Sequence, residues 1–154
     1  MKKVIFVASS GGHLTEILRL KELFKDYNYL LVTEKTDVTE KMVNDYNMDF
    51  LVYGPSTNKI DYIIRILKNI FLSIKIIMKF KPQTIISTGA QVGGIMCLFG
   101  KIFGCKIIYI ESLARVKELS STGNRVYKFA DKFYVQWESL TKKYKKAEYL
   151  GRLI

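Results

Sequence analysis

The chain has 154 residues, of which 49% are apolar, so it is long enough to form one domain with a sizeable core. Its 25 Lys and Arg residues against 14 Asp and Glu residues give a net charge of +11. This excess favours an anionic partner: nucleic acid, an anionic membrane surface or a phosphorylated substrate. Cys97 and Cys105 lack the spacing and companion histidines of a zinc site, so we expect no metal and two reduced core cysteines. We find no signal peptide before the first predicted strand and no uncharged run long enough to span a bilayer.

Strand and helix patterns alternate along the chain. Short apolar runs predict strands over 3–8, 29–33, 49–53, 84–87, 106–110, 132–136 and 148–150. Helical periodicity predicts helices over 14–24, 38–46, 60–80, 91–103, 124–130 and 140–146, with Thr36 or Asp37 as cap of the second. Such alternation is typical of an α/β fold, so we predict a Rossmann-like, doubly wound parallel sheet with helices on both faces.

The first predicted strand runs into the turn Ser9-Ser10-Gly11-Gly12-His13, which holds the single histidine of the chain. Free backbone N–H groups and the dipole at a helix start favour an anion, most often a phosphate. Gly11 and Gly12 allow the backbone to approach such a group, and Ser10 lies beside them. A neutral imidazole at His13 is able to take a proton from a ligand hydroxyl, and helix capping is the alternative role. The turn lacks the G-x-G-x-x-G pattern, which disfavours an NAD site.

A second glycine-rich turn follows the fourth predicted strand and contributes Thr88, Gly89, Gln91, Gly93 and Gly94. Because strands one and four are neighbours in the usual doubly wound order, we expect both turns to line one pocket. Close packing of the helix on the sheet explains Gly93 and Gly94 equally well.

A third loop, after the fifth predicted strand, contains Glu111 and Arg115. We interpret Glu111 either as a hydrogen-bond acceptor for a sugar hydroxyl or as an N-cap or salt-bridge partner of Arg115.

The helix predicted over 60–80 is apolar around more of its circumference than one buried stripe requires. We assign nine residues to the face on the sheet: Ile60, Ile63, Ile64, Leu67, Ile70, Phe71, Ile74, Ile77 and Met78. We predict that a basic stripe and a second apolar flank lie on an anionic membrane surface: Arg65, Lys68, Lys75 and Lys79 with Tyr62, Ile66, Ile76 and Phe80. Packing against a neighbouring helix or a partner subunit is the alternative. Aromatic residues occur at core spacing, so we do not expect nucleic-acid binding.

Several short blocks occur in an order that belongs to a known protein family. They are Ser9–His13, Ser87–Ala90, Tyr109–Val116, Leu119-Ser120 with Thr122-Gly123, Phe129–Asp131 and Val135-Gln136-Trp137. The chain resembles, over nearly its whole length, the asparagine-linked-glycosylation protein fourteen family, including bacterial capsule and exopolysaccharide proteins of the CpsF and PssD type. The Gly-Gly-His turn is shared with a wider group that includes the MurG glycosyltransferase.

The resemblance implies that residues 1–154 form a single GT-B N-terminal half-domain. This half would bind a polyprenyl-diphosphate-linked saccharide, and a separate partner subunit would bind the UDP-sugar. His13 would be the general base of an inverting transfer, and Gly11, Gly12 and the 89–94 loop would hold the acceptor diphosphate. Glu111 and Arg115 would serve the acceptor or the subunit contact. We expect no cofactor, a peripheral location on the cytoplasmic face of the plasma membrane, and a tail over 149–154 that docks on the partner.

Two other functions remain open at this stage. The chain could be a catalytically silent scaffold that recruits and stimulates its partner at the membrane. It could also be a stand-alone nucleotide- or phosphate-binding Rossmann module.

Overall fold

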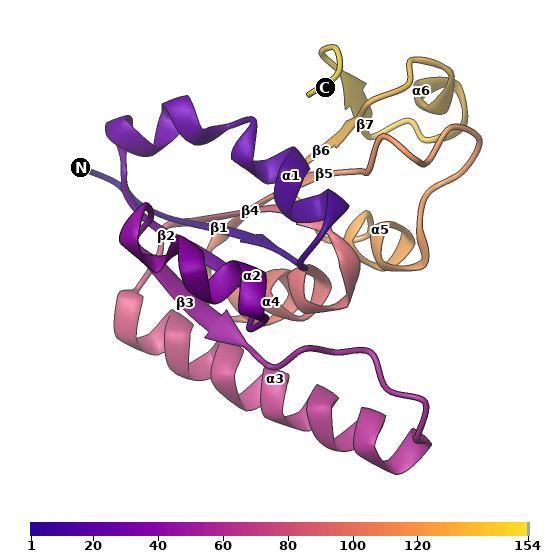
Figure 1. Ribbon diagram of the computed structural model, residues 1–154. Coiled ribbons are helices and arrows are strands. Elements are labelled where there is room, and N and C mark those ends of the chain that lie inside the picture. Colours follow the sequence, from indigo (N-terminus) through magenta and orange to yellow (C-terminus); the bar gives the residue numbers. More distant parts are fainter. Residues whose placement is uncertain (154) are drawn as a thin grey trace.

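The sheet is parallel throughout and has the predicted doubly wound order. A computed structural model describes residues 1–153 (Figure 1). Its strands follow the order β3-β2-β1-β4-β5-β6-β7. They are β1 (Lys3–Ala8), β2 (Asn28–Glu34), β3 (Met48–Leu51), β4 (Thr84–Gly89), β5 (Lys106–Ile110), β6 (Lys132–Val135) and β7 (Ala147–Tyr149). The order reverses between β1 and β4, which pair directly, so the switch point lies between their carboxyl ends.

Helices follow the strands close to the predicted places, although α1, α2, α5 and α6 are shorter than expected. The helices are α1 (Gly12–Leu18), α2 (Asp37–Glu40), α3 (Lys59–Phe80), α4 (Ala90–Ile102), α5 (Ser121–Val126) and α6 (Ser139–Lys143). The patterns over 14–24 and 38–46 each split into a short α-helix and a 3-10 turn, η1 (Lys21–Asp26) and η2 (Lys41–Asn44). Thr36 caps α2, because its hydroxyl accepts from Thr39 N at 3.2 Å while the Thr39 hydroxyl accepts from Thr36 N at 2.9 Å.

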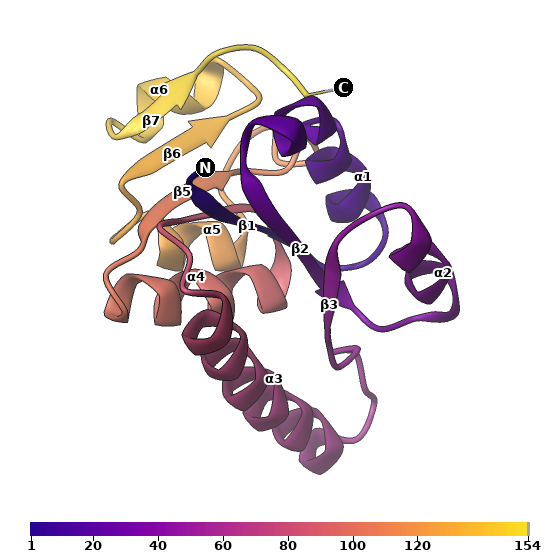
Figure 2. The same ribbon diagram turned by 90° about the vertical axis from the view of Figure 1, so that its left-hand side faces the viewer.

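The two faces of the sheet carry separate apolar layers. Side chains alternate along β1, so Ile5 and Val7 join one buried cluster while Val4, Phe6 and Ala8 join the other. Figures 1 and 2 show α1 on one face and α3, α4 and α5 on the opposite face. This two-sided burial explains why nearly all strand residues are apolar. Cys97 and Cys105 are buried and unbridged, as predicted.

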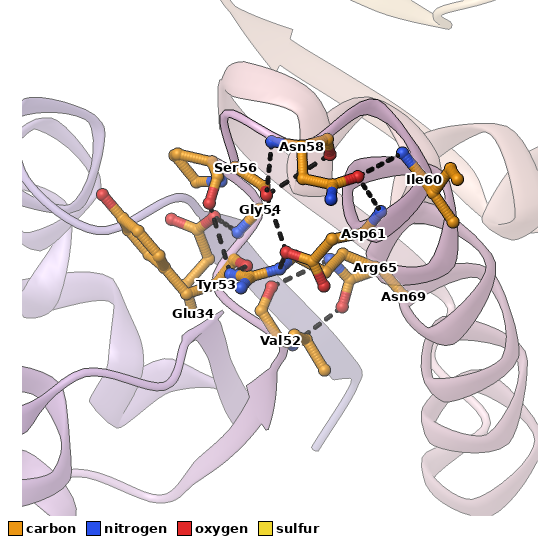
Figure 3. Close-up of polar contacts among 11 residues, drawn as sticks. Glu34, Val52, Tyr53, Gly54, Ser56, Asn58, Ile60, Asp61, Arg65 and Asn69 are labelled. Atoms are coloured by element: carbon orange, nitrogen blue, oxygen red, sulfur yellow. Dashed lines mark hydrogen bonds and ion pairs between the residues drawn. The ribbon is translucent and has the colours of Figure 1, made fainter.

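Helix α3 packs on the body through a face that combines two polar residues, Asn69 and Ser73, with the core residues Ile76 and Ile77. Asn69 is fully buried, its Oδ1 accepts from Val52 N at 2.7 Å, and its Nδ2 donates to Val52 O at 2.9 Å (Figure 3). Val52 directly follows β3, so Asn69 satisfies backbone groups that no neighbouring strand reaches. Ser73, one turn later, is also fully buried. The amide bridge therefore sets which face of α3 lies on the sheet.

The predicted inner and outer faces of α3 are largely exchanged in the structure. Six residues assigned to the core are exposed, and they form what we call the outer face of α3: Ile60, Ile63, Ile64, Leu67, Phe71 and Met78. Ile76, predicted to face a membrane, is 4% exposed, so that prediction is wrong. Ile66 and Phe80 are half-buried, Phe80 packs against the core, and Tyr62 turns toward α4. A helix that is apolar on two sides does not reveal by periodicity which side is buried.

The outer face of α3 lies beside the predicted basic residues. Lys68, Lys75 and Lys79 are exposed, at helical positions next to the apolar stripe. The amino-terminal half of α3 projects past the edge of the sheet (Figures 1 and 2). Among residues 1–153, no helix combines the length and the apolar character needed to cross a membrane.

Removing the Asn69 amide should destabilise the protein. We expect Asn69→Leu to lower the free energy of unfolding by about 2 kcal/mol, because Val52 N–H and C=O lose their partners beneath the helix. The matched change Asn44→Leu, at an exposed position of η2, should stay within about 0.5 kcal/mol of the parent. Denaturant unfolding followed by Trp137 fluorescence measures both. Equal stability of the two variants would show that the amide bridge does not fix α3.

Candidate functional site

The turns after β1 and β4 meet at the switch point and are bonded to each other. Ala8 and Gly89 are register partners in the sheet. The His13 ring Nδ1 lies 2.9 Å from the Thr88 carbonyl oxygen, and the Thr88 hydroxyl donates to the His13 carbonyl at 2.7 Å. This reciprocal pair holds the amino-terminal end of α1 against the end of β4.

The hydrogen bond to Thr88 determines the tautomer of His13. A carbonyl oxygen only accepts, so Nδ1 must carry the proton that lies between the two atoms. In the neutral ring Nε2 is then the unprotonated nitrogen and the available proton acceptor. The ring is half-buried, so it keeps contact with the space above the sheet. The unprotonated Nε2 is therefore the ring nitrogen that can accept a hydrogen bond or a proton.

Gly89 allows this close approach of the His13 ring. Its φ is +120°, and a Cβ added there would lie 3.1 Å from His13 Cε1 and 3.0 Å from the Tyr109 hydroxyl oxygen. The next residue, Ala90, also has a positive φ of +63°, which an L-residue adopts only at an energetic cost. The turn from β4 into α4 is thus strained at the point where it meets His13.

The Tyr109 hydroxyl is a buried group near His13 that sequence analysis missed. Within residues 1–153 its oxygen has no hydrogen-bond partner. Burial, with the nearby Glu111 charge, raises the pKa of Tyr109, so the phenol stays protonated at neutral pH. Its place in an apolar strand gave no sign that the hydroxyl would lie beside Gly89.

A polar pocket of about 290 Å³ opens beside the first turn. Its lining residues come from the carboxyl ends of β1 and β2, the segment after β3, the first turn of α3 and the start of α4: Ser9, Ser10, Glu34, Tyr53, Gly54, Pro55, Tyr62, Ala90 and Gln91. Glu34 is its central acceptor, since Oε2 accepts from Ser10 N and Ser10 Oγ at 3.0 Å each and Oε1 accepts from Gly54 N at 2.9 Å. Sequence analysis did not identify Glu34 as a site residue. Its position, a charged residue at the carboxyl end of a buried strand, could have indicated one.

The segment between β3 and α3 is held in place by Arg65. Its Nε bonds Asp61 Oδ2 at 2.8 Å, and its Nη1 donates to the Tyr53 and Pro55 carbonyls at 2.9 and 3.2 Å (Figure 3). Asn58 caps the helix by accepting from Ile60 N at 2.9 Å. Arg65 therefore shapes one wall of the polar pocket, whereas the other residues of the predicted basic stripe, Lys68, Lys75 and Lys79, are exposed.

Several predicted ligand-binding residues instead hold the loops together. Ser10 donates to Glu34 through both N and Oγ, and Thr88 bonds His13. A Cβ on Gly93 would collide with the Ser87 hydroxyl, and one on Gly94 would lie 2.6 Å from Thr122 Cγ2. The two glycines therefore serve helix packing, the structural alternative considered for them. Gly11 and Gly12 are exposed at the start of α1, and Gln91 lines the polar pocket.

Glu111 is fully buried and does not reach a ligand. Its Oε1 accepts from Ser112 N at 3.0 Å, and its Oε2 accepts from Ser120 N and Oγ at 2.9 and 3.1 Å. Burial raises the pKa of this carboxyl, although these hydrogen bonds oppose the shift. The sugar-binding role is therefore wrong, and Glu111 instead fixes the loop before α5. Arg115 is exposed, and no ion pair joins it to Glu111 within the described part of the chain.

A second buried glutamate, also missed, connects α1 to the carboxyl ends of β5 and β6. Glu16 accepts from the Ser112 hydroxyl at 2.9 Å and from Gln136 Nε2 at 3.4 Å. Gln136 Oε1 in turn accepts from Leu153 N at 2.8 Å, and the Arg152 guanidinium lies 3.9 Å from the centre of the Trp137 ring. The tail up to residue 153 thus contacts its own sheet, and Ile154 lies outside the described residues.

Comparison with known proteins identifies the family. The model for "oligosaccharide biosynthesis protein Alg14 like" matches residues 56–153, more than half of the chain. A UDP-N-acetylglucosamine transferase subunit ALG14 from Debaryomyces hansenii is 32% identical, with 98% of this chain and 76% of the relative covered. The chain belongs to the Alg14 family. The human member is 29% identical, with 98% of this chain and 82% of that protein covered. The Gly-Gly-His turn lies before the residues that the Alg14 model matches, but within the span that these relatives cover.

Solved structures show the same fold as this Alg14-family chain. MurG from Acinetobacter baumannii superposes with a TM-score of 0.73 at 18% identity, covering 88% of this chain and 42% of MurG. UDP-N-acetylglucosamine 2-epimerase from Rickettsia bellii gives a TM-score of 0.75 at 13% identity, covering 99% of this chain and 45% of the epimerase. The chain thus spans less than half of either protein, and at these identities the likeness concerns the fold alone.

Proposed function

We propose that the chain is the acceptor-binding, membrane-associating subunit of a two-subunit inverting glycosyltransferase. In this proposal it binds a polyprenyl-diphosphate-linked saccharide, and a partner subunit supplies the UDP-sugar and closes over the switch point. Residues 1–154 then correspond to the N-terminal half of a GT-B enzyme. The saccharide is an intermediate of capsule or exopolysaccharide synthesis, as the resemblance to CpsF and PssD type proteins implies.

The main support for this proposal is that the chain belongs to a family whose relatives are named transferase subunits. The human and Debaryomyces hansenii proteins are both UDP-N-acetylglucosamine transferase subunits, aligned over 98% of this chain. A subunit needs a partner, and the MurG-like fold provides the shape of a GT-B half. UDP-N-acetylglucosamine is accordingly the first donor to assay.

The site supplies the acceptor side of the reaction. An acceptor hydroxyl gives its proton to His13 Nε2, and its oxygen attacks the anomeric carbon of the UDP-sugar. The new glycosidic bond forms as the bond to the phosphate oxygen breaks, and UDP leaves with that electron pair. In the neutral ring, the bond from Nδ1 to the Thr88 carbonyl leaves Nε2 as the nitrogen without a proton. Exposed Gly11 and Gly12 and the start of α4 offer backbone donors to the acceptor diphosphate.

The outer face of α3 supports a peripheral position on an anionic membrane. Apolar side chains that point away from the body stabilise the protein only when something covers them. Lys68, Lys75 and Lys79 beside them match the charge of anionic lipid headgroups. The net charge of +11 adds to this attraction, and the cytoplasmic leaflet of the plasma membrane is the surface we propose.

Reconstitution tests the two-subunit proposal. The purified chain, a donor-binding candidate subunit and an equimolar mixture are each given UDP-N-acetylglucosamine and a polyprenyl-diphosphate-linked saccharide. We expect sugar transfer from the mixture and none from either protein alone. Transfer by this chain without a companion would contradict the proposal. So would a donor-binding subunit that glycosylates the lipid acceptor equally well by itself.

A further inference from the structure

An apolar groove of about 490 Å³ lies between α3, α4 and α5. This volume falls within the roughly 300–1,000 Å³ of typical small-molecule sites. Apolar surface makes up most of the groove lining, to which several polar residues also contribute. The lining residues are Tyr62, Ile66, Gln91, Gly94, Ile95, Leu98, Ser121, Thr122, Arg125, Val126 and Phe129. None of the roles described above uses this space.

The groove adjoins the polar pocket at one end. Tyr62 and Gln91 line both, and Gln91 Nε2 donates to the Tyr62 hydroxyl at 2.6 Å, so this pair forms the boundary between them. The two spaces therefore lie side by side at the start of α4, with this pair between them. A molecule with a hydrocarbon part and a polar part could occupy both by passing this pair.

The other side of the groove continues into exposed apolar surface. Leu98 lines the groove and is 46% exposed, and Ile102, one helical turn later, is 67% exposed. Ile66 on the opposite wall lies one turn from Ile63 on the outer face of α3. A hydrocarbon chain could thus pass from the proposed membrane surface into the groove along apolar side chains.

In the described part of the chain, one free positive charge lines the groove. Arg125 lines the groove and is exposed, and its guanidinium forms no hydrogen bond or ion pair within residues 1–153. The amino-terminal end of α4, a helix of 13 residues, adds the positive end of its dipole on the same side. A diphosphate is the anion that would join a hydrocarbon chain to a saccharide at this junction.

We propose that this groove binds the proximal isoprene units of a polyprenyl diphosphate. Arg125 adds a charged donor to the diphosphate contacts proposed above, Gly11, Gly12 and the start of α4, and the attached saccharide extends into the polar pocket beside Glu34. The inference rests on the proposed acceptor-binding function and adds where the lipid lies. A bilayer phospholipid could also place a hydrocarbon chain in the groove. It carries no saccharide, however, that would extend into the polar pocket.

Photolabelling tests the assignment. The probe is a polyprenyl diphosphate with a diazirine on its first isoprene unit, presented to the full chain in uncharged detergent micelles. We expect labelling of groove residues, competed by unlabelled polyprenyl diphosphate and not by a zwitterionic phospholipid. Leu98→Trp fills the groove and should reduce labelling and affinity roughly tenfold, as expected for the loss of a fitted hydrocarbon group. Leu23→Trp, the same substitution at an exposed position of η1 that is outside both the groove lining and the apolar surface leading to it, is the matched control and should bind as the parent does.

A charge variant separates the diphosphate contact from simple hydrophobic binding. Arg125→Gln should weaken binding of the diphosphate probe roughly tenfold, the loss of one charge-assisted hydrogen bond, and leave binding of the uncharged prenol analogue unchanged. Labelling confined to the outer face of α3, or equal losses in Leu98→Trp and Leu23→Trp, would overturn the groove assignment and leave the acceptor-binding function standing. No competed labelling anywhere on this chain would overturn both.

Discussion

His13→Asn is expected to lower the transfer rate of the reconstituted pair by about 10²–10⁴, the usual contribution of a general base. Asparagine has no basic nitrogen, so the acceptor hydroxyl would lose its proton acceptor. The KM for the lipid-linked acceptor should change little, because the diphosphate and the hydrocarbon chain are bound elsewhere. Initial rates at saturating UDP-sugar and varied acceptor concentration measure both quantities.

Two controls make the His13 result interpretable. Thr15→Ala alters an exposed side chain on the same helix, whose hydroxyl bonds the Gly11 carbonyl at 3.3 Å, and should keep nearly full activity. Equal thermal unfolding midpoints would show that the His13 variant folds normally. If His13→Asn transfers sugar at the parental rate, the chain is a scaffold that recruits its partner, and the chemistry belongs entirely to that partner.

The strand order and the meeting of the two glycine-rich turns could be predicted from local patterns. Each strand from β1 to β6 is an apolar run bounded by polar or turn residues, and parallel order follows from helices between the strands. Strands β1 and β4 then become neighbours, which places His13 beside Thr88 and Gly89. These inferences needed no knowledge of which side chains touch.

The roles of individual polar residues could not be predicted in the same way. Glu111 and Glu34 both occur at the carboxyl end of a strand, yet one is enclosed by the loop before α5 and the other lines the polar pocket. That difference depends on how the later segments fold over each carboxylate. The inner face of α3 likewise depends on long-range contacts, among them the two hydrogen bonds between Asn69 and Val52, which lie 17 positions apart. Periodicity describes a helix by itself and contains no information on such partners.

Charging the outer face of α3 should abolish membrane binding. We expect the parent chain to float with vesicles containing anionic lipid at low salt, and Leu67→Glu/Phe71→Glu to bind at least ~10²-fold more weakly. Each substitution removes the roughly 1.5–3 kcal/mol that burial of such a side chain provides. The two new carboxylates would also be repelled by the anionic surface that attracts Lys68, Lys75 and Lys79.

A matched charge change elsewhere distinguishes the outer face from net charge alone. Val38→Glu/Val43→Glu introduces the same two carboxylates at exposed apolar positions of α2 and η2, away from α3. This variant should keep most of its vesicle binding, because long-range attraction falls only slightly at a net charge near +9. Equal losses in the two double variants would mean that the charge of the whole chain, rather than α3, drives binding. Failure of the parent to float would remove the membrane from the proposed function, and a partner protein would then have to cover the exposed side chains of α3.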